Sequence, residues 1–204
     1  MQADSSGWCS KTVPDLIDPV VLAIPAGGVP IGWEVARALS ANLSLAIVRK
    51  IRIPGNTESG FGAVTWDGQL LINEELCSAL GLSAHEVEYA ITKTRENVRE
   101  HIGRFMEHTT FPSLEGKTAI LTDDGLASGF TMLAAIQSIR QKKPSRIIAA
   151  VPTASLSAAQ RIAACVDLVI CLNIRSSRMF AVADAYEDWY DLDDNEVLRE
   201  LGGV

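Results

Sequence analysis

The fold of this chain is decided by residues 118–133, which read TAILTDDGLASGFTML. The apolar run that opens the stretch is typical of a buried strand, and it ends on two adjacent carboxylates, Asp123 and Asp124. A short loop with two glycines follows, and the chain then favours a helix over residues 130–141. Because the N–H groups at a helix N-terminus bind phosphate, this order of elements indicates a site for a phosphorylated sugar.

The chemistry of the stretch supports that interpretation. A carboxylate at a strand end can accept hydrogen bonds from two neighbouring sugar hydroxyls or hold a divalent cation. Residues 125–131, GLASGFT, offer consecutive backbone N–H groups and the hydroxyls of Ser128 and Thr131. The loop has no lysine, so it is not a Walker A motif, and residues 26–32, AGGVPIG, do not match the dinucleotide-binding G-x-G-x-x-G.

Composition limits the class of protein. The 204 residues suit one α/β domain with a well-buried core. With 18 Lys and Arg against 25 Asp and Glu, the formal net charge is −7, which disfavours binding to a nucleic-acid backbone. The four cysteines show no C-x-x-C spacing, and no apolar run approaches the ~20 residues that span a bilayer. We therefore expect a cytoplasmic protein with small-molecule partners, and neither nucleic acid nor membrane.

Apolar runs alternate with helical patterns along the rest of the chain. Strands are predicted at residues 20–25, 45–51, 119–122, 146–151 and 167–172, and a hairpin is predicted around Asp67-Gly68. A capping box formed by Ser83 and Glu86 opens a long helix over residues 83–107. This alternation predicts an α/β fold with a doubly wound, mainly parallel five-stranded sheet. We expect an N-terminal arm (residues 1–19), an α/β core (20–172) and a C-terminal hood (173–204).

Two further stretches indicate the other half of a binding site. The turn Ala26-Gly27-Gly28 after the first strand lets the backbone approach a ligand, or it simply makes a tight turn. The predicted strand 45–51 ends among Arg49, Lys50 and Arg52, at the sheet edge where ligands of open α/β sheets bind. Residues 52–62, RIPGNTESGFG, are polar and glycine-rich, as in a mobile flap.

Residues 121–131, LTDDGLASGFT, resemble the phosphoribosyl pyrophosphate (PRPP) motif of type I phosphoribosyltransferases, in which a strand, two acidic residues and a loop ending in Gly-x-Thr follow one another. Residues 25–30 (PAGGVP), 48–50 (VRK), 54–56 (PGN) and 185–188 (AYED) resemble a subgroup of phosphoribosyltransferases predicted from sequence. The resemblance runs from about residue 20 to the C-terminus. It implies the type I phosphoribosyltransferase fold and a role in nucleotide metabolism.

The resemblance also implies an activity, the Mg²⁺-dependent transfer of 5-phosphoribose from PRPP to a nitrogenous acceptor with release of pyrophosphate. Asp123 and Asp124 would hold the ribose hydroxyls, while Arg49 and Lys50 would face the pyrophosphate; these four are the expected catalytic residues. The remaining expected contacts fall into three groups: the 5′-phosphate loop (Gly125, Leu126, Ala127, Ser128, Gly129, Thr131), the pyrophosphate loop (Ala26, Gly27, Gly28) and the hood that meets the acceptor (Ala183, Asp184, Tyr186).

In this fold the pyrophosphate loop often contains a cis non-proline peptide. The resemblance implies that Mg²⁺ is carried by PRPP and water, with no direct protein ligand and at most a water-mediated contact to Asp123 or Asp124. Ala26 stands where many members of the subgroup have Arg. An alternative is therefore a PRPP-binding regulatory protein with weak or no transferase activity, and a third interpretation is a hydrolase of a phosphorylated sugar. The acceptor, the direction of the reaction and formation of a homodimer stay open.

Overall fold

The computed structural model describes residues 15–56, 59–105, 111–177, 180–190 and 192–201. Most of the predicted N-terminal arm, residues 1–19, lies outside these ranges. No helix in the described ranges is both long enough and apolar enough to cross a membrane.

A five-stranded, wholly parallel sheet forms the centre of the fold, as the alternating pattern predicted. Its strand order is β2-β1-β6-β7-β8, so β6, the strand of the opening stretch, lies in the middle. The five strands are β1 (Val20–Ala23), β2 (Asn42–Leu45), β6 (Thr118–Thr122), β7 (Arg146–Ser155) and β8 (Leu168–Arg175).

Helices bury both faces of this sheet, which explains why β1 and β6 read as continuous apolar runs. On one face, α4 (Phe130–Arg140) and α5 (Leu156–Ala163) share one apolar cluster with alternate strand residues such as Leu22 and Leu121. On the other face, α1 (Gly28–Leu39) packs against Val21 and Ile120. Successive strand residues point to opposite faces, so one apolar strand contributes side chains to the apolar clusters on both faces of the sheet.

The prediction of a single strand over residues 45–51 is wrong, because most of this stretch belongs to a second, antiparallel sheet. It contains β3 (Val48–Arg52), β4 (Gly60–Thr65) and β5 (Leu70–Ile72), in the order β3-β4-β5. The chain therefore leaves the parallel sheet after Leu45, and the buried residues Ala46 and Ile47 connect the two sheets. Residues 45–51 carry no turn residue, so a hydrophobic pattern cannot reveal the break.

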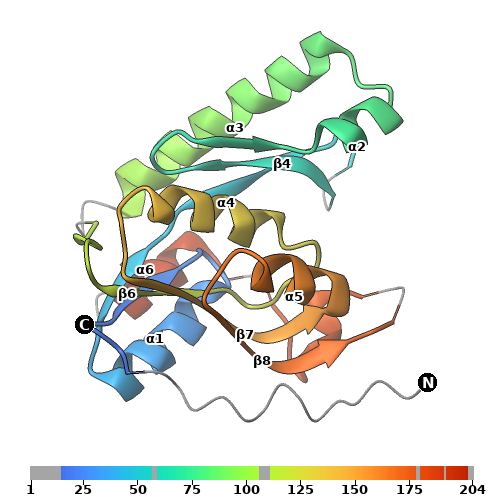
Figure 1. The fold of residues 1–204 in the computed structure, drawn as a ribbon. Helices are drawn as coiled ribbons and strands as arrows, with labels where there is room; N and C mark the ends of the chain where they lie inside the picture. The colour runs from blue at the N-terminus through green and yellow to red at the C-terminus, as the bar shows by residue number, and fades with distance from the viewer. Residues whose placement is uncertain (1–14, 57–58, 106–110, 178–179, 191, 202–204) are drawn as a thin grey trace.

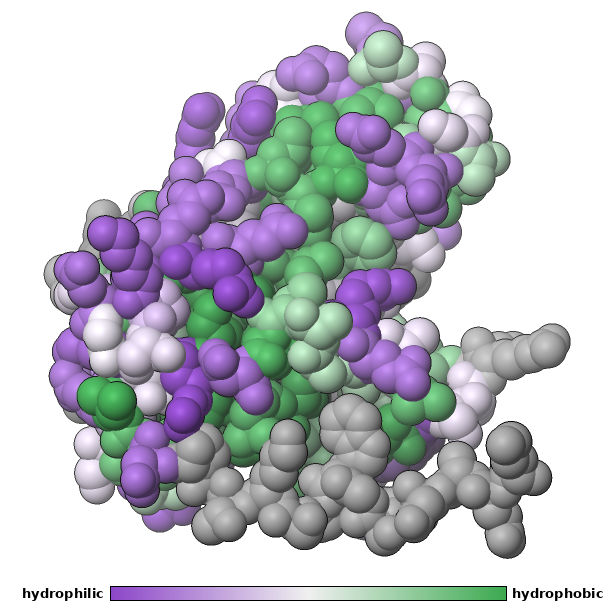
Figure 2. All heavy atoms as spheres, in the orientation of Figure 1, coloured by the Kyte–Doolittle hydropathy of each residue, from purple (hydrophilic) through white to green (hydrophobic). Residues whose placement is uncertain are grey.

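The second sheet lies between two helices (Figure 1). The long helix α3 (Ala84–Phe105) packs on one side of it and α4 packs on the other, which places α4 between the two sheets. Figure 2 shows apolar side chains gathered over the region of β4 and α4, with polar side chains on either side. The predicted flap, residues 52–62, coincides with the end of β3, its connection to β4 and the start of β4.

The capping box predicted for α3 is present. The Glu86 N–H donates to Ser83 Oγ at 3.3 Å, and the Ser83 N–H donates to Glu86 Oε2 at 2.9 Å. A short helix that was not predicted, α2 (Glu74–Ala79), precedes α3 and is capped by Asn73, whose Oδ1 accepts from the Leu76 N–H at 3.0 Å.

The C-terminal segment packs onto the rest of the molecule. β8 continues to Arg175, three residues beyond the predicted end of the core at 172. A 3₁₀ helix, η2 (Val182–Ala185), and the helix α6 (Asp194–Leu201) follow. Val197 and Leu201 of α6 are buried in one apolar cluster with Val98 of α3 and Val29 of α1. The C-terminal segment is therefore anchored to α1 and α3.

Asp67, in the β4–β5 turn, connects the second sheet to α4. Its carboxylate accepts hydrogen bonds from Thr65 Oγ1 at 2.6 Å and from the fully buried Ser138 Oγ of α4 at 2.7 Å. Gln69 Nε2 donates at 3.3 Å, and Lys142 Nζ lies 3.7 Å away. Burial on its own would raise the pKa of Asp67, but these donors and the Lys142 charge outweigh it and lower the pKa.

We expect Asp67→Asn to lower the free energy of unfolding by about 1 kcal/mol at neutral pH, since the site is partly exposed to solvent. Asparagine suits the same turn before Gly68, but it removes the charge and replaces one of the two acceptor oxygens with an NH2 donor. Because the folded pKa is the lower one, the stabilisation is present above the unfolded pKa and lost as pH falls through the folded value. Urea unfolding over a pH series should show the difference between wild type and variant shrinking below about pH 4. A difference that did not change with pH would contradict this account.

Candidate active site

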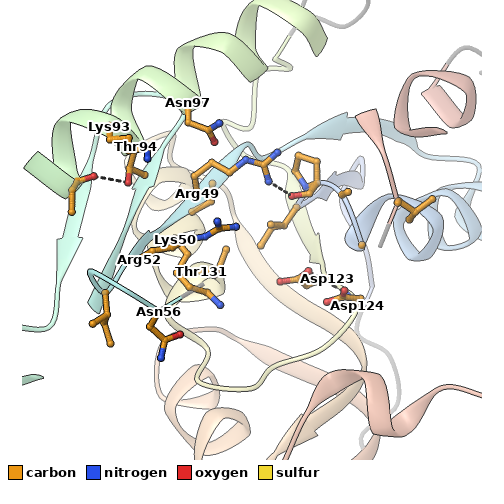
Figure 3. Close-up of a pocket in the computed structure, with 18 of the residues that line it drawn as sticks. Arg49, Lys50, Arg52, Asn56, Lys93, Thr94, Asn97, Asp123, Asp124 and Thr131 are labelled. Carbon is orange, nitrogen blue, oxygen red and sulfur yellow. Dashed lines mark hydrogen bonds between the residues drawn. The ribbon is translucent and has the colours of Figure 1, made fainter. Parts of the chain in front are cut away.

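A large cleft lies where the parallel sheet meets the second sheet. Its volume is about 1120 Å³. The β1–α1 turn, β3, α3, the end of β6, α4 and the C-terminal segment all contribute to its walls (Figure 3). Ligand pockets of roughly 300–1,000 Å³ are usual, so this cleft has room for more than one small molecule.

The acid pair lies on the wall formed by the end of β6. Asp123 and Asp124 both line the cleft, and the Asp124 N–H donates to Asp123 Oδ1 at 3.0 Å. Burial and the neighbouring Asp124 charge raise the pKa of Asp123 well above its usual value, while the Lys50 charge opposes the rise. The site therefore concentrates negative charge that a ligand or a cation can relieve.

Tyr186 connects the hood to the acid pair. Its hydroxyl donates to the Asp124 carbonyl oxygen at 2.7 Å. Burial, followed by the charges of Asp124 and Asp123, raises the pKa of Tyr186 to about 12. The phenol thus stays protonated and keeps its role as a donor at any ordinary pH.

The β1–α1 turn lies directly against the acid pair. A Cβ on Gly27 would lie 2.1 Å from Asp124 Oδ2, so any larger residue here would displace the Asp124 side chain. Thr122 Oγ1 donates to the Gly28 carbonyl oxygen at 3.0 Å and ties the start of α1 to the end of β6. The Pro25–Ala26 peptide bond is cis, as the resemblance implied.

The loop after the acid pair is held by β7. The Leu126 N–H donates to the Thr153 carbonyl oxygen at 3.0 Å, and the Ser155 N–H donates to the Leu126 carbonyl oxygen at 2.9 Å. The Leu126 side chain is buried. Leu126 was predicted to offer its N–H to a phosphate; that prediction is wrong, because Thr153 already takes this N–H. Leu126 supports the loop instead.

Other N–H groups of this loop are available. Within the described part of the chain, no protein acceptor takes the N–H groups of Ala127, Ser128 or Gly129. Gly129 has φ +78° and starts α4, so the loop turns directly into a helix N-terminus. Thr131, in the first turn of α4, lines the cleft. Residues 125–129 are not part of the lining, although they adjoin Asp124 in the chain.

Three cations lie on β3, in the antiparallel sheet instead of at the parallel edge where they were expected. Arg49, Lys50 and Arg52 all line the cleft, between α3 on one side and the acid pair on the other (Figure 3). Lys50 and Arg52 are exposed to it. Arg49 Nη1 donates to the Pro25 carbonyl oxygen at 2.9 Å, and burial lowers the pKa of Arg49 while the Asp194 charge opposes this. The structure thus brings these cations, the β1–α1 turn and the acid pair into one cleft.

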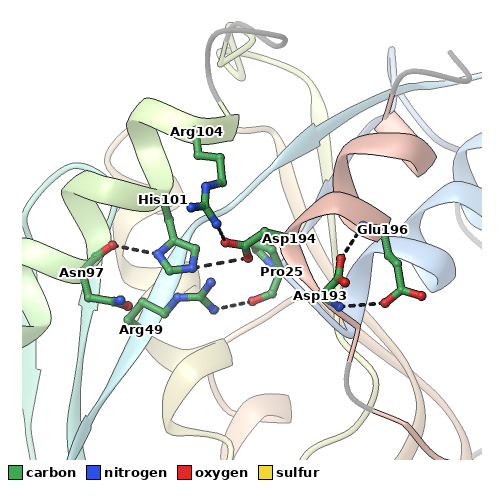
Figure 4. Close-up of polar contacts among 8 residues, drawn as sticks. All are labelled: Pro25, Arg49, Asn97, His101, Arg104, Asp193, Asp194 and Glu196. Carbon is green, nitrogen blue, oxygen red and sulfur yellow. Dashed lines mark hydrogen bonds and ion pairs between the residues drawn. The ribbon is translucent and has the colours of Figure 1, made fainter.

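An ionic cluster holds α6 against α3 near this point (Figure 4). Asp194, the first residue of α6, contacts Arg104 and lies 3.6 Å from His101 Nε2. His101 Nδ1 is 2.8 Å from the Asn97 carbonyl oxygen, which orients the ring. The contact fixes the segment that leads into α6 beside the cleft.

Sequence reasoning missed part of the lining. The C-terminal segment contributes Trp189, Tyr190 and Leu192, while the predicted hood residues Ala183 and Asp184 lie in η2 outside the lining. The helix α3 contributes Tyr89, Lys93 and Asn97, spaced four residues apart. That spacing is visible in the sequence as one face of a helix, but nothing local indicates that this face meets a ligand site.

The donor set is compatible with a magnesium ion that a ligand brings. Among the described residues, no group of three or more His, Cys, Asp or Glu side chains could hold a metal on its own. Mg²⁺ keeps several waters and usually needs only one or two carboxylates besides phosphate oxygens. Asp123 and Asp124 supply two such carboxylates.

Comparisons with known proteins agree with this geometry. Residues 6–187 match the family model described as the phosphoribosyl transferase domain. Two Mycobacterium tuberculosis proteins, "Putative phosphoribosyl transferase MT0597" and "Putative phosphoribosyl transferase Rv0571c", are each 33% identical over 182 residues. The match covers 89% of this chain and 41% of each relative, so the chain spans less than half the length of these curated relatives.

A solved structure extends the comparison. The crystal structure of TT1426 from Thermus thermophilus superposes with a TM-score of 0.72 at 34% identity, covering 91% of this chain and 88% of that one. Since the family model matches most of the sequence, this chain belongs to the phosphoribosyl transferase domain family.

Proposed function

We propose that this chain is a Mg²⁺-dependent phosphoribosyltransferase that transfers 5-phosphoribose from PRPP to a nitrogenous acceptor and releases pyrophosphate. The observation that carries the proposal is the convergence in one cleft of the acid pair, the β1–α1 turn and the cations of β3. Membership of the phosphoribosyl transferase domain family supports the choice of PRPP as the phosphorylated sugar.

In this proposal, the ribose and its 5′-phosphate bind on the β6 side of the cleft. Asp123 and Asp124 accept hydrogen bonds from the two ribose hydroxyls, which an ionised carboxylate does well. The N–H groups of residues 127–129 and the Thr131 hydroxyl bind the 5′-phosphate at the N-terminus of α4. Leu126 holds this loop in place through β7.

The pyrophosphate binds on the opposite side of the cleft, between the β1–α1 turn and β3. Ala26 and Gly27 line the cleft and offer backbone groups, whereas the Gly28 N–H already donates to the Ile24 carbonyl oxygen at 2.9 Å. The exposed cations Lys50 and Arg52 balance the pyrophosphate charge. Arg49 fixes the turn by its hydrogen bond to the Pro25 carbonyl oxygen. Mg²⁺, held by PRPP oxygens and water with at most a water-mediated contact to Asp123 or Asp124, would neutralise part of the pyrophosphate charge.

Transfer then depends mainly on electrostatics. The bond between ribose C1 and the pyrophosphate oxygen breaks with its electron pair leaving on pyrophosphate. A bond from C1 to the acceptor nitrogen forms, and the acceptor's N–H proton passes to water or to the released pyrophosphate. Negative charge grows on the leaving pyrophosphate, where Lys50, Arg52 and the backbone of the β1–α1 turn stabilise it. Residues 52–62 serve as the flap that excludes water, which would otherwise compete with the acceptor.

One observation favours a second candidate, a PRPP-binding regulatory protein with weak or no transferase activity. Ala26 adds no cation to the β1–α1 turn, and Arg49 is occupied with the Pro25 carbonyl oxygen. An assay of labelled PRPP with Mg²⁺ and a panel of nitrogenous acceptors separates the two. Pyrophosphate release with at least one acceptor supports the enzyme, and tight binding without release for every acceptor supports the regulator.

Under either function, replacing both Asp123 and Asp124 by Asn should weaken PRPP binding by on the order of 100-fold, because two charge-assisted contacts are lost. Isothermal titration with PRPP and Mg²⁺ measures the affinity. Glu74→Gln with Glu75→Gln is the matched control, since these adjacent acidic residues are exposed on α2, away from the cleft. Wild-type affinity in the Asp123/Asp124 double variant would refute the assignment of the ribose site.

The pH dependence of PRPP binding tests the same pair. The pKa of Asp123 is raised, so PRPP affinity should increase as pH rises through that pKa and the carboxyl ionises. Asp124→Asn removes the neighbouring charge, lowers the pKa of Asp123 and should move the midpoint of the increase to lower pH.

Wild type and Asp124→Asn are each titrated with PRPP over the same pH series, and the midpoints of the two affinity curves are compared. Protonation of PRPP affects both curves alike. A midpoint that stayed in place or moved to higher pH in Asp124→Asn would show that Asp123 does not control the affinity.

A further inference from the structure

The end of β7 and the helix α5 together hold consecutive carbonyl oxygens of the loop that follows the acid pair. The Leu126 oxygen accepts from the Ser155 N–H at 2.9 Å, and the Ala127 oxygen accepts from Ser155 Oγ at 2.8 Å. The Ser128 oxygen accepts from Arg161 Nη1 of α5. Successive peptide planes of the loop are therefore fixed from the same side.

The direction of the loop's N–H groups follows from these contacts. In a trans peptide, the C=O of one residue and the N–H of the next lie in one plane and point in opposite directions, and no peptide bond in this loop is cis. Holding the carbonyls of residues 126–128 therefore turns the N–H groups of residues 127–129 away from β7 and α5. These are the N–H groups that the proposed function assigns to the 5′-phosphate.

The peptide plane between Ser128 and Gly129 depends most on a single exposed side chain. Ser155 is nearly buried, and its hydroxyl is also fixed as the cap of α5, where it accepts from the Ala158 N–H at 3.1 Å. Arg161, in contrast, is exposed. Glycine populates positive and negative φ about equally, so this plane could rotate away from the observed φ of +78° at little steric cost. Rotation would turn the Ser128 oxygen toward a bound phosphate and the Gly129 N–H away from it.

Phe130 holds the Arg161 side chain beside the loop. The guanidinium carbon lies 5.2 Å from the centroid of the Phe130 ring, which is a cation–π contact. Phe130 is the middle residue of the Gly-x-Thr sequence at 129–131, so the bulky residue of this motif has its partner on α5. No carboxylate in the described ranges forms an ion pair with Arg161. The guanidinium therefore contacts the loop and its first helical residue, with no competing ion pair.

We propose that Arg161 is a positioning residue of the 5′-phosphate site, which holds the Ser128 carbonyl oxygen and thereby keeps the Gly129 N–H directed at the phosphate. Ser155 has the same role for the N–H groups of Ala127 and Ser128. The inference rests on the proposed function, because it names the residues that orient the phosphate donors of that site. Arg161 does not line the cleft, so its effect reaches the ligand through the peptide plane.

Arg161→Met tests the proposal, since methionine keeps an unbranched side chain that suits a helix and removes the guanidinium donor. Residual dipolar couplings of the backbone N–H groups, measured by NMR without ligand, report the direction of each N–H. In Arg161→Met the coupling of Gly129 should change. The coupling of Ala127 should stay as in wild type, because Ser155 still holds the peptide plane before it.

Ligand affinity is then measured with ribose 5-phosphate and, separately, with pyrophosphate and Mg²⁺. Arg161→Met should bind ribose 5-phosphate about tenfold more weakly than wild type, the effect of losing one hydrogen bond to a charged group. Its affinity for pyrophosphate should stay within about twofold, because the proposed function places pyrophosphate between the β1–α1 turn and β3.

Arg140→Met is the matched control. Arg140 is an exposed arginine in the last turn of α4 that donates to the Cys165 carbonyl oxygen, so the variant removes the same kind of contact at the far end of α4 from the loop. It should keep the wild-type couplings and both affinities.

Each of three results would overturn the proposal: an unchanged Gly129 coupling in Arg161→Met, an unchanged affinity of this variant for ribose 5-phosphate, or an equal loss of affinity for pyrophosphate. If wild type bound neither PRPP nor ribose 5-phosphate, the proposed function would fail. The couplings would still decide whether Arg161 sets the direction of the Gly129 N–H.

Discussion

The close approach of the β1–α1 turn to the end of β6 is the constraint on which the site depends. Gly27 leaves no room for a Cβ beside Asp124 Oδ2, and Thr122 holds the Gly28 carbonyl oxygen. Both contacts follow from the pairing of β1 with β6 as parallel neighbours, since that pairing brings their carboxyl ends together. The pairing of the two strands thereby places the backbone turn and the two carboxylates next to each other.

The cations of β3 are brought to the same cleft by a different part of the chain. The chain leaves the parallel sheet after Leu45 and enters β3, whose side chains then face the acid pair across the cleft. Arg49 joins the two halves through the Pro25 carbonyl oxygen, and Asp194 of α6 faces Arg49. Thr122 of β6 and Arg49 of β3 hold the β1–α1 turn, and the charge of Asp194 in α6 acts on Arg49. A change in α6, or in the α3 residues that hold Asp194, can therefore affect the site without touching a ligand.

Sequence reasoning succeeded where the signal is local. The apolar strands, the Ser83–Glu86 box and the acid pair with its loop are each contained in a few consecutive residues. Sequence reasoning failed where a feature depends on contacts between residues that are far apart in the chain. The break between Leu45 and Val48 has no turn residue, the N–H of Leu126 is taken by a strand 27 residues away (126 to 153), and the α3 residues that line the cleft depend on which helix face meets β3.

The distribution of charge explains how such a cleft could orient its substrate. The β6 wall carries two carboxylates, one with a raised pKa, and the β3 wall carries Lys50 and Arg52. Under the proposed function, PRPP matches this separation, because its ribose offers hydroxyl donors at one end and its pyrophosphate offers negative charge at the other. A ligand placed the other way round would put the pyrophosphate oxygens against the two carboxylates in place of the ribose hydroxyls, at a cost that grows as water leaves the cleft. Orientation and the exclusion of water therefore reinforce each other, and the orientation depends on the approach of the β1–α1 turn to the acid pair.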